Sequence, residues 1–546
     1  MNLSTNDIPG SDLGQPVFIF FILLTLISPL IKSLSFIILN FKALLNNFGT
    51  MTVGGQDNRE APDLEAENAK EAGELEHQEI QDALNPPKLD RHGLPLVPQP
   101  SDHGDDPLNW SFPAKLVVLL QISVLALIGN MSAAVINPAF VPLGKAFSIT
   151  TVEASYELTV YVIFAGVGPL FIMPLSNTLG RRPIYLFGNL LAASTNIAAG
   201  YCTTWSGLLA TRVFNGIGAG STVAMGAATI CDLYFLHERG LYMGVYTFFL
   251  TNGPHVAPLV GGFVAQRLGW RQCFRIPSYV QFAIFALNLL CLPETLYSRA
   301  ETAPGEVYKS NSYLNLISFS SHHMPKRNVN IRDWGKPFKM LNYGTVIFAA
   351  TGSHVFREKY GFSVETTGLM LSVPLLIGCL IGEFNAGWFT DWLVYRHAKK
   401  HNGERSPEAR LDALWLALLL PIGLIIQGVC ISHHETTGWV GNAFGMGIAS
   451  FGLQVATTCV YSYTTDCYKP QSSEISSLLN LFRSIFSAFI SFYAVPLADK
   501  IQFQYAWLVL AMINIAFLLP LAMLRLHGKR IRQTVWQAPP EFNRDL

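Results

Sequence analysis

The sequence is poor in charged residues, which make up 14% of its 546 positions, against about 25% in a typical soluble protein. Lys and Arg together number 37, as do Asp and Glu, so no charge excess favours a nucleic-acid partner. The eight cysteines include no Cys-x-x-Cys pair and no metal-ligand spacing, so we expect no metal or cofactor. No nucleophile elbow or phosphate-binding loop is present, which argues against an enzyme.

Apolar residues take the place of the missing charge, at 50% of the chain with a mean hydropathy of +0.32. A helix needs about 20 predominantly apolar residues to cross a bilayer. This criterion predicts an all-α membrane protein with six spans, a polar loop and six more spans. The predicted spans are 115–138, 153–175, 183–202, 206–230, 241–265, 273–292, 340–356, 366–390, 411–432, 437–463, 474–497 and 504–526.

The region before the first span has two parts. Residues 1–50 contain an apolar run at 16–31, which is interpreted as an extra span, an interfacial helix or a stretch outside the working protein. The third interpretation arises because Met51 opens a sequence typical of the start of a cytosolic tail. Residues 51–112 are acidic with few large apolar groups, so they are predicted to be disordered.

The predicted organisation follows from these segments and from the loops. It consists of an apolar extension (1–50), a disordered acidic cytosolic tail (51–112), a six-helix bundle (113–293), a cytosolic central loop (294–339), a second six-helix bundle (340–528) and a cytosolic tail (529–546). Basic residues concentrate in alternate loops, which places those loops and both ends of the twelve-span core in the cytosol. The seventh span is short and polar, which indicates either a broken, cavity-lining helix or a missing piece of coding sequence.

The loop after the second helix recurs in both halves, as MPLSNTLGRRP at 173–183 and GWFTDWLVYR at 387–396. Both match part of the pattern Gly-x-x-x-Asp-x-x-Gly-Arg-Arg. The first copy has Gly180, Arg181 and Arg182 with Asn177 at the acidic position, and the second has Gly387, Asp391 and Arg396. Repetition between halves is typical of transporters built from two related bundles.

The fifth span contains an unusual stretch, GVYTFFLTNGPHVAPLVGG at 244–262. Its small residues favour close packing of helices in a membrane. The stretch resembles the antiporter signature Gly-x8-Gly-x3-Gly-Pro-x2-Gly-Gly, with one alanine in place of glycine. The matching residues are Gly244, Gly253, Ala257, Pro258, Gly261 and Gly262.

With these loops and RVFNGIGAG at 212–220, residues 105–530 resemble the major facilitator superfamily, in particular the fungal twelve-span drug:proton antiporters. The resemblance implies two six-helix bundles and proton-coupled antiport. It also implies that the two repeated loops form a cytosolic gate, and that Arg212 takes part in proton coupling. A structural arginine that binds backbone carbonyls is the alternative for Arg212.

Two further residues are candidates for proton coupling. Glu383 precedes Asp391 by eight residues, which places it roughly 12 Å deeper in a helix. It is interpreted as a proton carrier or as a partner for a basic residue of the gate. His255 titrates in a useful range, although a packing role is the alternative. The first half has no acid central to a span, since Glu153 and Glu157 are expected at the outer mouth of the second span.

The substrate cavity is expected between the halves near the middle of the bilayer. Polar candidates to line it are Asn130 and Asn137 in the first span, with Gln454 and Tyr461 in the tenth. Aromatic residues such as Phe248 and Phe249 are further candidates, with helix packing as the alternative.

The predicted function is proton-driven efflux of a drug, toxin or fungal secondary metabolite by alternating access. One alternative is a proton symporter that imports a nutrient or an organic cation such as a polyamine. Another is a non-transporting membrane receptor. The expected partners are a small-molecule substrate, protons and the lipid bilayer of the plasma membrane, with the vacuolar membrane as the second choice. The chain is expected to work as a monomer.

Overall fold

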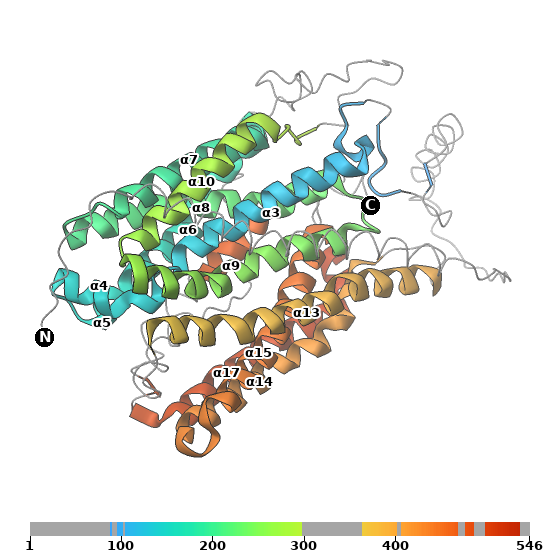
Figure 1. Ribbon diagram of the computed structural model, residues 1–546. Coiled ribbons are helices and arrows are strands. Elements are labelled where there is room, and N and C mark those ends of the chain that lie inside the picture. The colour runs from blue at the N-terminus through green and yellow to red at the C-terminus, as the bar shows by residue number, and fades with distance from the viewer. Residues whose placement is uncertain are drawn as a thin grey trace, which may run out of the picture. The chain divides into compact units, whose positions relative to one another are not determined.

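The computed structural model describes residues 88–89, 96–101, 104–297, 363–400, 406–467, 475–484, 497–498 and 500–534. The extension at 1–50 and the seventh span at 340–356 lie outside these residues, as does most of the central loop. The described elements are helices (Figure 1). In chain order they are η1 (Pro107–Asn109), α3 (Phe112–Ala134), η2 (Asn137–Ala139), α4 (Phe140–Phe147), α5 (Thr151–Ala154), α6 (Tyr156–Leu179), α7 (Arg181–Ala199), α8 (Trp205–Leu233), α9 (Arg239–Leu268), α10 (Gln272–Cys291), α13 (Val364–Lys400), η5 (Pro407–Leu418), α14 (Leu419–Ser432), α15 (His434–Cys467) and α17 (Phe503–Thr534).

Ten of the twelve predicted spans coincide with these helices, and helix 475–484 covers part of the eleventh. Eight of the described helices are long and apolar enough to cross a membrane. The helices α7 and α9 are not among those eight, and both carry buried polar side chains, Asn189 and Asn196 in α7 and Asn252 and His255 in α9. Their neighbours shield these groups from lipid: α7 packs on α8 and α10, and α9 packs on α3 and α13.

Helix α9 joins the first half of the chain to the second, lying between α3 and α13 in Figure 1. A Cβ atom on Gly253 would lie 2.7 Å from the Leu127 carbonyl oxygen of α3. On another face of α9, a Cβ atom on Gly262 would lie 2.9 Å from the carbonyl oxygen of Val364, which begins α13. Glycine therefore lets the α9 backbone touch a helix of each half.

A second contact between the halves involves α6 and helix 475–484. Asn480 donates a hydrogen bond from Nδ2 to the carbonyl oxygen of Ala165, at 3.0 Å. A Cβ atom on the adjacent Gly166 would lie 2.6 Å from Cβ of Ser484. The second and eleventh spans thus meet as the fifth and eighth do, which is the pairing expected of two related bundles.

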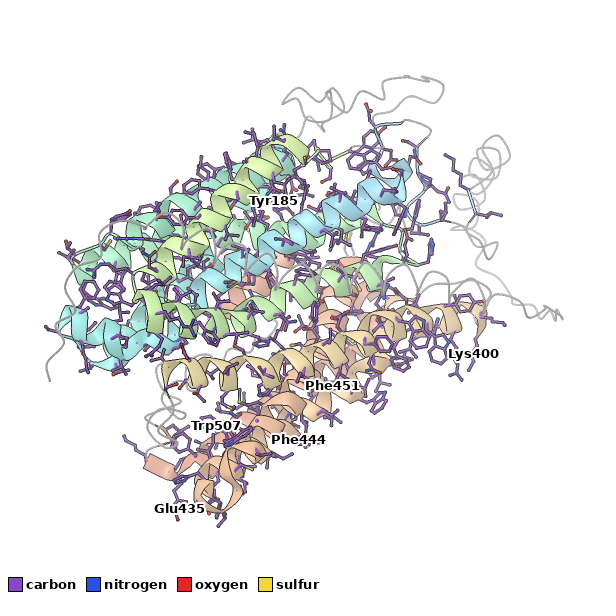
Figure 2. All side chains as sticks on the ribbon, viewed as in Figure 1. Tyr185, Lys400, Glu435, Phe444, Phe451 and Trp507 are labelled. Atoms are coloured by element: carbon purple, nitrogen blue, oxygen red, sulfur yellow. The ribbon has the colours of Figure 1, made fainter. Side chains whose placement is uncertain are left out.

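The second half is held by apolar packing of α13, α14, α15 and α17. Trp507 is fully buried in α17 and donates from Nε1 to Oε1 of Gln427, at 3.1 Å. Figure 2 shows Lys400, the end of α13, and Glu435, near the start of α15, at opposite ends of this group. The intervening η5 and α14 run back between those ends and form the predicted ninth span.

Two predicted boundaries differ from the structure. The tail 51–112 was expected to be disordered, yet residues 104–111 are folded against the first bundle. Buried Asp106 accepts hydrogen bonds from the backbone N–H groups of Leu108, at 3.0 Å, and Ser101, at 2.9 Å. This capping orders a segment that lacks an apolar core of its own. At the other end, α17 continues to Thr534, beyond the predicted boundary at 528.

Candidate functional site

Four charged residues form a buried network at the ends of helices from both halves, which we call the gate network. Arg410 of η5 binds Asp391 of α13 through Nη1 and Asp466 of α15 through Nε, each at 2.6 Å. Arg239, which begins α9, binds the other oxygen of Asp466 at 3.0 Å. The network therefore connects the fifth span to the eighth, ninth and tenth.

Backbone groups complete the gate network. Asp391 accepts a hydrogen bond from the Leu241 N–H at 2.8 Å. The Arg410 guanidinium donates to the Leu236 carbonyl oxygen at 3.2 Å. Both arginines are fully buried, so these bonds replace the water that their charges lose.

The second repeated loop supplies Asp391 to the gate network but not Arg396. Arg396 is exposed, and its guanidinium lies over the Trp392 ring at 5.2 Å. Gly387 lies one turn before Asp391 and leaves room for the Glu383 carboxyl, 3.0 Å from where its Cβ atom would be. The cation that binds Asp391 in the network is Arg410, which the motif does not contain. The sequence signal for Arg410 was its position at the start of the ninth span, at the end predicted to face the cytosol.

The first repeated loop forms a separate set of bonds around Arg181. Its guanidinium donates to Oδ1 of Asn177 at 2.8 Å and to Oγ of Ser176 at 3.0 Å. Its Nε lies 3.3 Å from the Asp232 carboxylate at the end of α8. Gly180 has a φ of +99°, a conformation that favours glycine, and this turn allows α7 to begin directly after α6.

Glu294, which follows α10, caps the start of α7. Its carboxylate accepts hydrogen bonds from the N–H groups of Arg181 at 2.9 Å and Arg182 at 3.1 Å. It also accepts from the N–H of Leu296 at 2.9 Å. Burial raises the pKa of Glu294, and these hydrogen bonds oppose the rise because they favour the charged form. The Arg182 guanidinium donates to the Leu289 carbonyl oxygen of α10 at 2.8 Å.

Glu383 lies where α9, α13 and α15 meet. Its Oε2 accepts hydrogen bonds from Nε2 of Gln454 and Oγ1 of Thr458, both at 2.7 Å. Within the described part of the chain, no cation lies within ion-pair distance of this carboxyl. The second interpretation of Glu383, as a partner of a basic gate residue, thus has no support among those residues.

The opposite carboxylate oxygen of Glu383 faces the antiporter-like stretch of α9. A Cβ atom on Gly244 would overlap Glu383 Oε1, so glycine makes room for the acid. The hydroxyl groups of Thr247 on α9 and Thr458 on α15 lie 2.8 Å apart. The first glycine of the stretch and the candidate proton carrier are therefore direct neighbours across the two halves.

The remaining glycines of the stretch bring backbones together. A Cβ atom on Gly261 would overlap the Val135 carbonyl oxygen at the end of α3. Ala257 is fully buried. His255 lies in the same interface, with Nδ1 3.6 Å from Sγ of Cys379 on α13. This contact fits the packing interpretation of His255.

Arg212 is fully buried in α8 and has both polar and charged neighbours. It donates from Nη2 to Oδ1 of Asn196 at 2.6 Å. Its Nε lies 3.7 Å from Oε2 of Glu157, which is also fully buried. Glu157 was expected at an outer mouth, but the structure places it inside the bundle. The sequence signal was that α6 and α8 both begin at the predicted outer face, so residues near their starts lie at similar depth.

The four cavity candidates have different surroundings. Asn130 donates to the Leu250 carbonyl oxygen at 3.0 Å and so links α3 to α9. Asn137 is buried in η2. Gln454 binds Glu383, and Tyr461 is 6% exposed, about two turns further along α15. The structure thus brings Gln454, but not Asn130 or Asn137, to the Glu383 carboxyl.

Comparisons with known proteins agree with this architecture. A sequence profile described as the Major Facilitator Superfamily matches residues 122–491. The chain is 26% identical to the efflux pump radE of Floropilus chiversii over 82% of this chain and 87% of that protein. It is also 26% identical to the probable efflux pump mfs2 of Aspergillus flavus, over 70% and 95% respectively.

Solved structures show the same fold. The human organic anion transporter MFSD10 superposes with a TM-score of 0.54 and 16% identity, over 75% of this chain and 99% of that one. The proton:xylose symporter XylE superposes with a TM-score of 0.51 and 14% identity, over 75% and 95%. Together with the paired bundles and the profile match over most of the chain, these likenesses lead to one conclusion: this chain is a membrane transporter that belongs to the Major Facilitator Superfamily.

Proposed function

We propose that this transporter exports amphipathic organic molecules in exchange for protons. The observation that carries the proposal is the contact between Gly244, in the antiporter-like stretch of α9, and the Glu383 carboxyl of α13. An acid that binds and releases protons in this interface changes the charge between the two halves. The names of the relatives radE and mfs2 as efflux pumps support the outward direction.

The chemistry of Glu383 explains how a proton affects the interface. Its carboxylate has two hydrogen-bond donors, Gln454 and Thr458, and neither is charged. An ionised carboxyl without a cation is costly in a low-dielectric interior. Proton binding removes that charge, which lets the α9–α13 interface rearrange with the acid still inside. Proton release toward the cytosol restores the charged form for the next cycle.

The gate network supplies the second element of the proposed cycle. It ties Arg239 of the first half to Asp466 of the second at the end predicted to face the cytosol. When these bonds hold, the cytosolic end is closed, and when they break, cargo enters the space between the bundles. We place the working transporter in the plasma membrane as a monomer, with protons and a small organic molecule as its partners.

The proposal is tested in a yeast strain that lacks its own drug pumps and expresses the full chain. A panel of amphipathic toxins identifies a compound whose toxicity the chain relieves. Inside-out plasma-membrane vesicles should then accumulate that compound when their lumen is acid, and a protonophore should abolish the accumulation. Proton-driven uptake of a nutrient into intact cells, without any relief from toxins, would instead establish the symporter.

Glu383→Gln is the matching variant, because glutamine keeps the side-chain shape but cannot bind a proton reversibly. We expect it to abolish accumulation driven by the pH gradient. Exchange of cargo across the membrane should remain when the pH is the same on both sides. Arg396→Gln, on the exposed face of the same helix, is the control and should transport normally. If Glu383→Gln vesicles retain gradient-driven accumulation, Glu383 is not the proton carrier.

A further inference from the structure

Glu157 and Arg212 form a buried ion pair with unusual geometry. Both side chains are 0% exposed, and Oε2 of Glu157 lies 3.7 Å from Nε of Arg212. Among the described residues, neither oxygen of the Glu157 carboxylate accepts a hydrogen bond. A buried pair offsets its desolvation only with close contact and additional hydrogen bonds. The Glu157 carboxylate is therefore stabilised by the charge of Arg212 and by no hydrogen bond from the described residues.

The arginine is held much better than the acid. Arg212 donates to Asn196 at 2.6 Å and to Asn215 at 3.5 Å. Its guanidinium also lies over the Phe274 ring, 4.6 Å from the centroid, in the geometry of a cation–π contact. These neutral partners remain when the acid loses its charge. Since arginine stays protonated in proteins, Glu157 is the member of the pair that can exchange a proton.

The helices that carry the pair cannot separate easily. A Cβ atom on Gly216 of α8 would lie 2.5 Å from the Tyr161 carbonyl oxygen of α6. A Cβ atom on Gly168 of α6 would lie 2.7 Å from Cα of Ile217 of α8. Such backbone contacts fix the two helices relative to each other. The charge on Glu157 must therefore be removed by a proton or kept in its pair, because helix movement within the bundle does not relieve it.

The other titratable groups around Glu157 are weak acids. Cys273 faces it from α10, and Tyr161 lies one turn further along α6. The Tyr161 hydroxyl donates to the Gly129 carbonyl oxygen of α3 at 2.8 Å. Glu153, on the preceding α5, is exposed and bonded to Thr150. Among the described residues, Arg212 is therefore the charged group that the Glu157 carboxylate faces.

We propose that Glu157 takes up and releases a proton within its pair with Arg212, as a second proton site besides Glu383. In this step hydronium gives a proton to the Glu157 carboxylate: one O–H bond of hydronium breaks, one O–H bond forms on the carboxyl group, and a water molecule is left. No other bond breaks, and the net charge of the pair changes from zero to +1. The inference deepens the antiport proposed above and rests on it. It gives each half of the transporter one proton-binding acid: Glu157 near the predicted outer end of α6 and Glu383 deeper in α13.

The test is an infrared difference titration of the purified full-length chain in lipid nanodiscs, which needs no substrate. A buried carboxylic acid gives a C=O stretching band that disappears when the proton leaves. We expect Glu157→Gln to lose one titrating component of this band and to keep the component that Glu383→Gln removes. Glu153→Gln is the matched control, since it removes an exposed glutamate four residues earlier, and should retain both components.

A spectrum of Glu157→Gln that matches the wild type at every pH overturns the proposal. If that variant does not fold, Arg212→Gln and Arg212→Lys test the same pair from the other side. Loss of the cation in Arg212→Gln should shift the titration of the Glu157 component of the C=O band to higher pH. Arg212→Lys keeps a cation and should shift it less. An unmoved component in both overturns the proposal. The proposed antiport is tested by gradient-driven transport in vesicles, whereas the proton site at Glu157 is tested by the infrared titration. The two proposals can therefore fail independently.

Discussion

The two repeated loops begin from the same pattern but perform different tasks. In the second half, Asp391 joins Arg410, Asp466 and Arg239 in a gate network that crosses from one half to the other. In the first half, Asn177 takes the Asp position, and among the described residues the bonds of Arg181 stay within the first half, from Ser176 to Glu294. One copy thus ties the halves together, and the other fixes the turn between α6 and α7.

The difference teaches that one amide in place of one carboxylate changes what a repeated motif can do. A carboxylate such as Asp391 satisfies a buried arginine with charge as well as with hydrogen bonds. An amide at 177 offers its oxygen without charge, so Arg181 takes its counter-charge from Asp232 on α8 instead. In the gate network, the Arg239–Asp466 ion pair joins the two halves, and Arg410 adds a hydrogen bond to the Leu236 carbonyl oxygen of the first half. The importance of these bonds can be tested.

Arg410→Ala should have the largest effect. It leaves Asp391 and Asp466 buried with one less cation, and breaking a buried pair by removing one partner costs about 3–5 kcal/mol. We expect a large fall in the melting temperature of the purified protein, measured by intrinsic fluorescence, and loss of gradient-driven export. Arg396→Ala, which removes an exposed arginine of the second repeated loop, is the control. Equal melting temperatures for the two variants would show that the gate network does not hold the halves.

The sequence predicted the fold more fully than the site. The apolar segments predicted ten helices that the structure shows, because lipid leaves few alternatives to a helix. The motifs located Asp391, Arg181 and the α9 stretch, because each motif is a short run of consecutive residues. Arg410 and Asp466 are 56 residues apart, and no local pattern connects them. Glu157 was missed for the same reason, since its depth depends on how α6 packs against α8.

Arg181→Ala should have an intermediate effect. The variant removes the bonds to Asn177, Ser176 and Asp232, but the Asp232 side chain is 22% exposed and can turn to water. The α7 cap survives, because Glu294 binds the backbone N–H of residue 181 rather than its side chain. We expect a loss of about 1–3 kcal/mol, seen as a smaller fall in melting temperature than in Arg410→Ala. Export should be slowed but retained, and a loss as complete as in Arg410→Ala would contradict the division of tasks.

Asn177→Asp, which restores the acid of the motif, should have the smallest effect. The new carboxylate would accept a charge-assisted bond from Arg181, whose Nη1 lies 2.8 Å from the present amide oxygen. Two effects oppose this gain: Asp232 already binds the same guanidinium, and residue 177 lies in the last turn of α6, where the helix dipole disfavours negative charge. We expect stabilisation of about 0–1 kcal/mol, and added salt should reduce it by screening.

The double variant Asn177→Asp with Arg181→Ala should lose that gain, since the new acid then has no arginine beside it. Export rates should stay close to those of the wild type in the single variant, because the bonds of Arg181 remain within the first half. A marked slowing of export by Asn177→Asp alone would mean that an acid at 177 reaches across to the second half. In that case the charge at this single position, rather than the placement of Arg410 and Arg239, would decide which loop closes the gate.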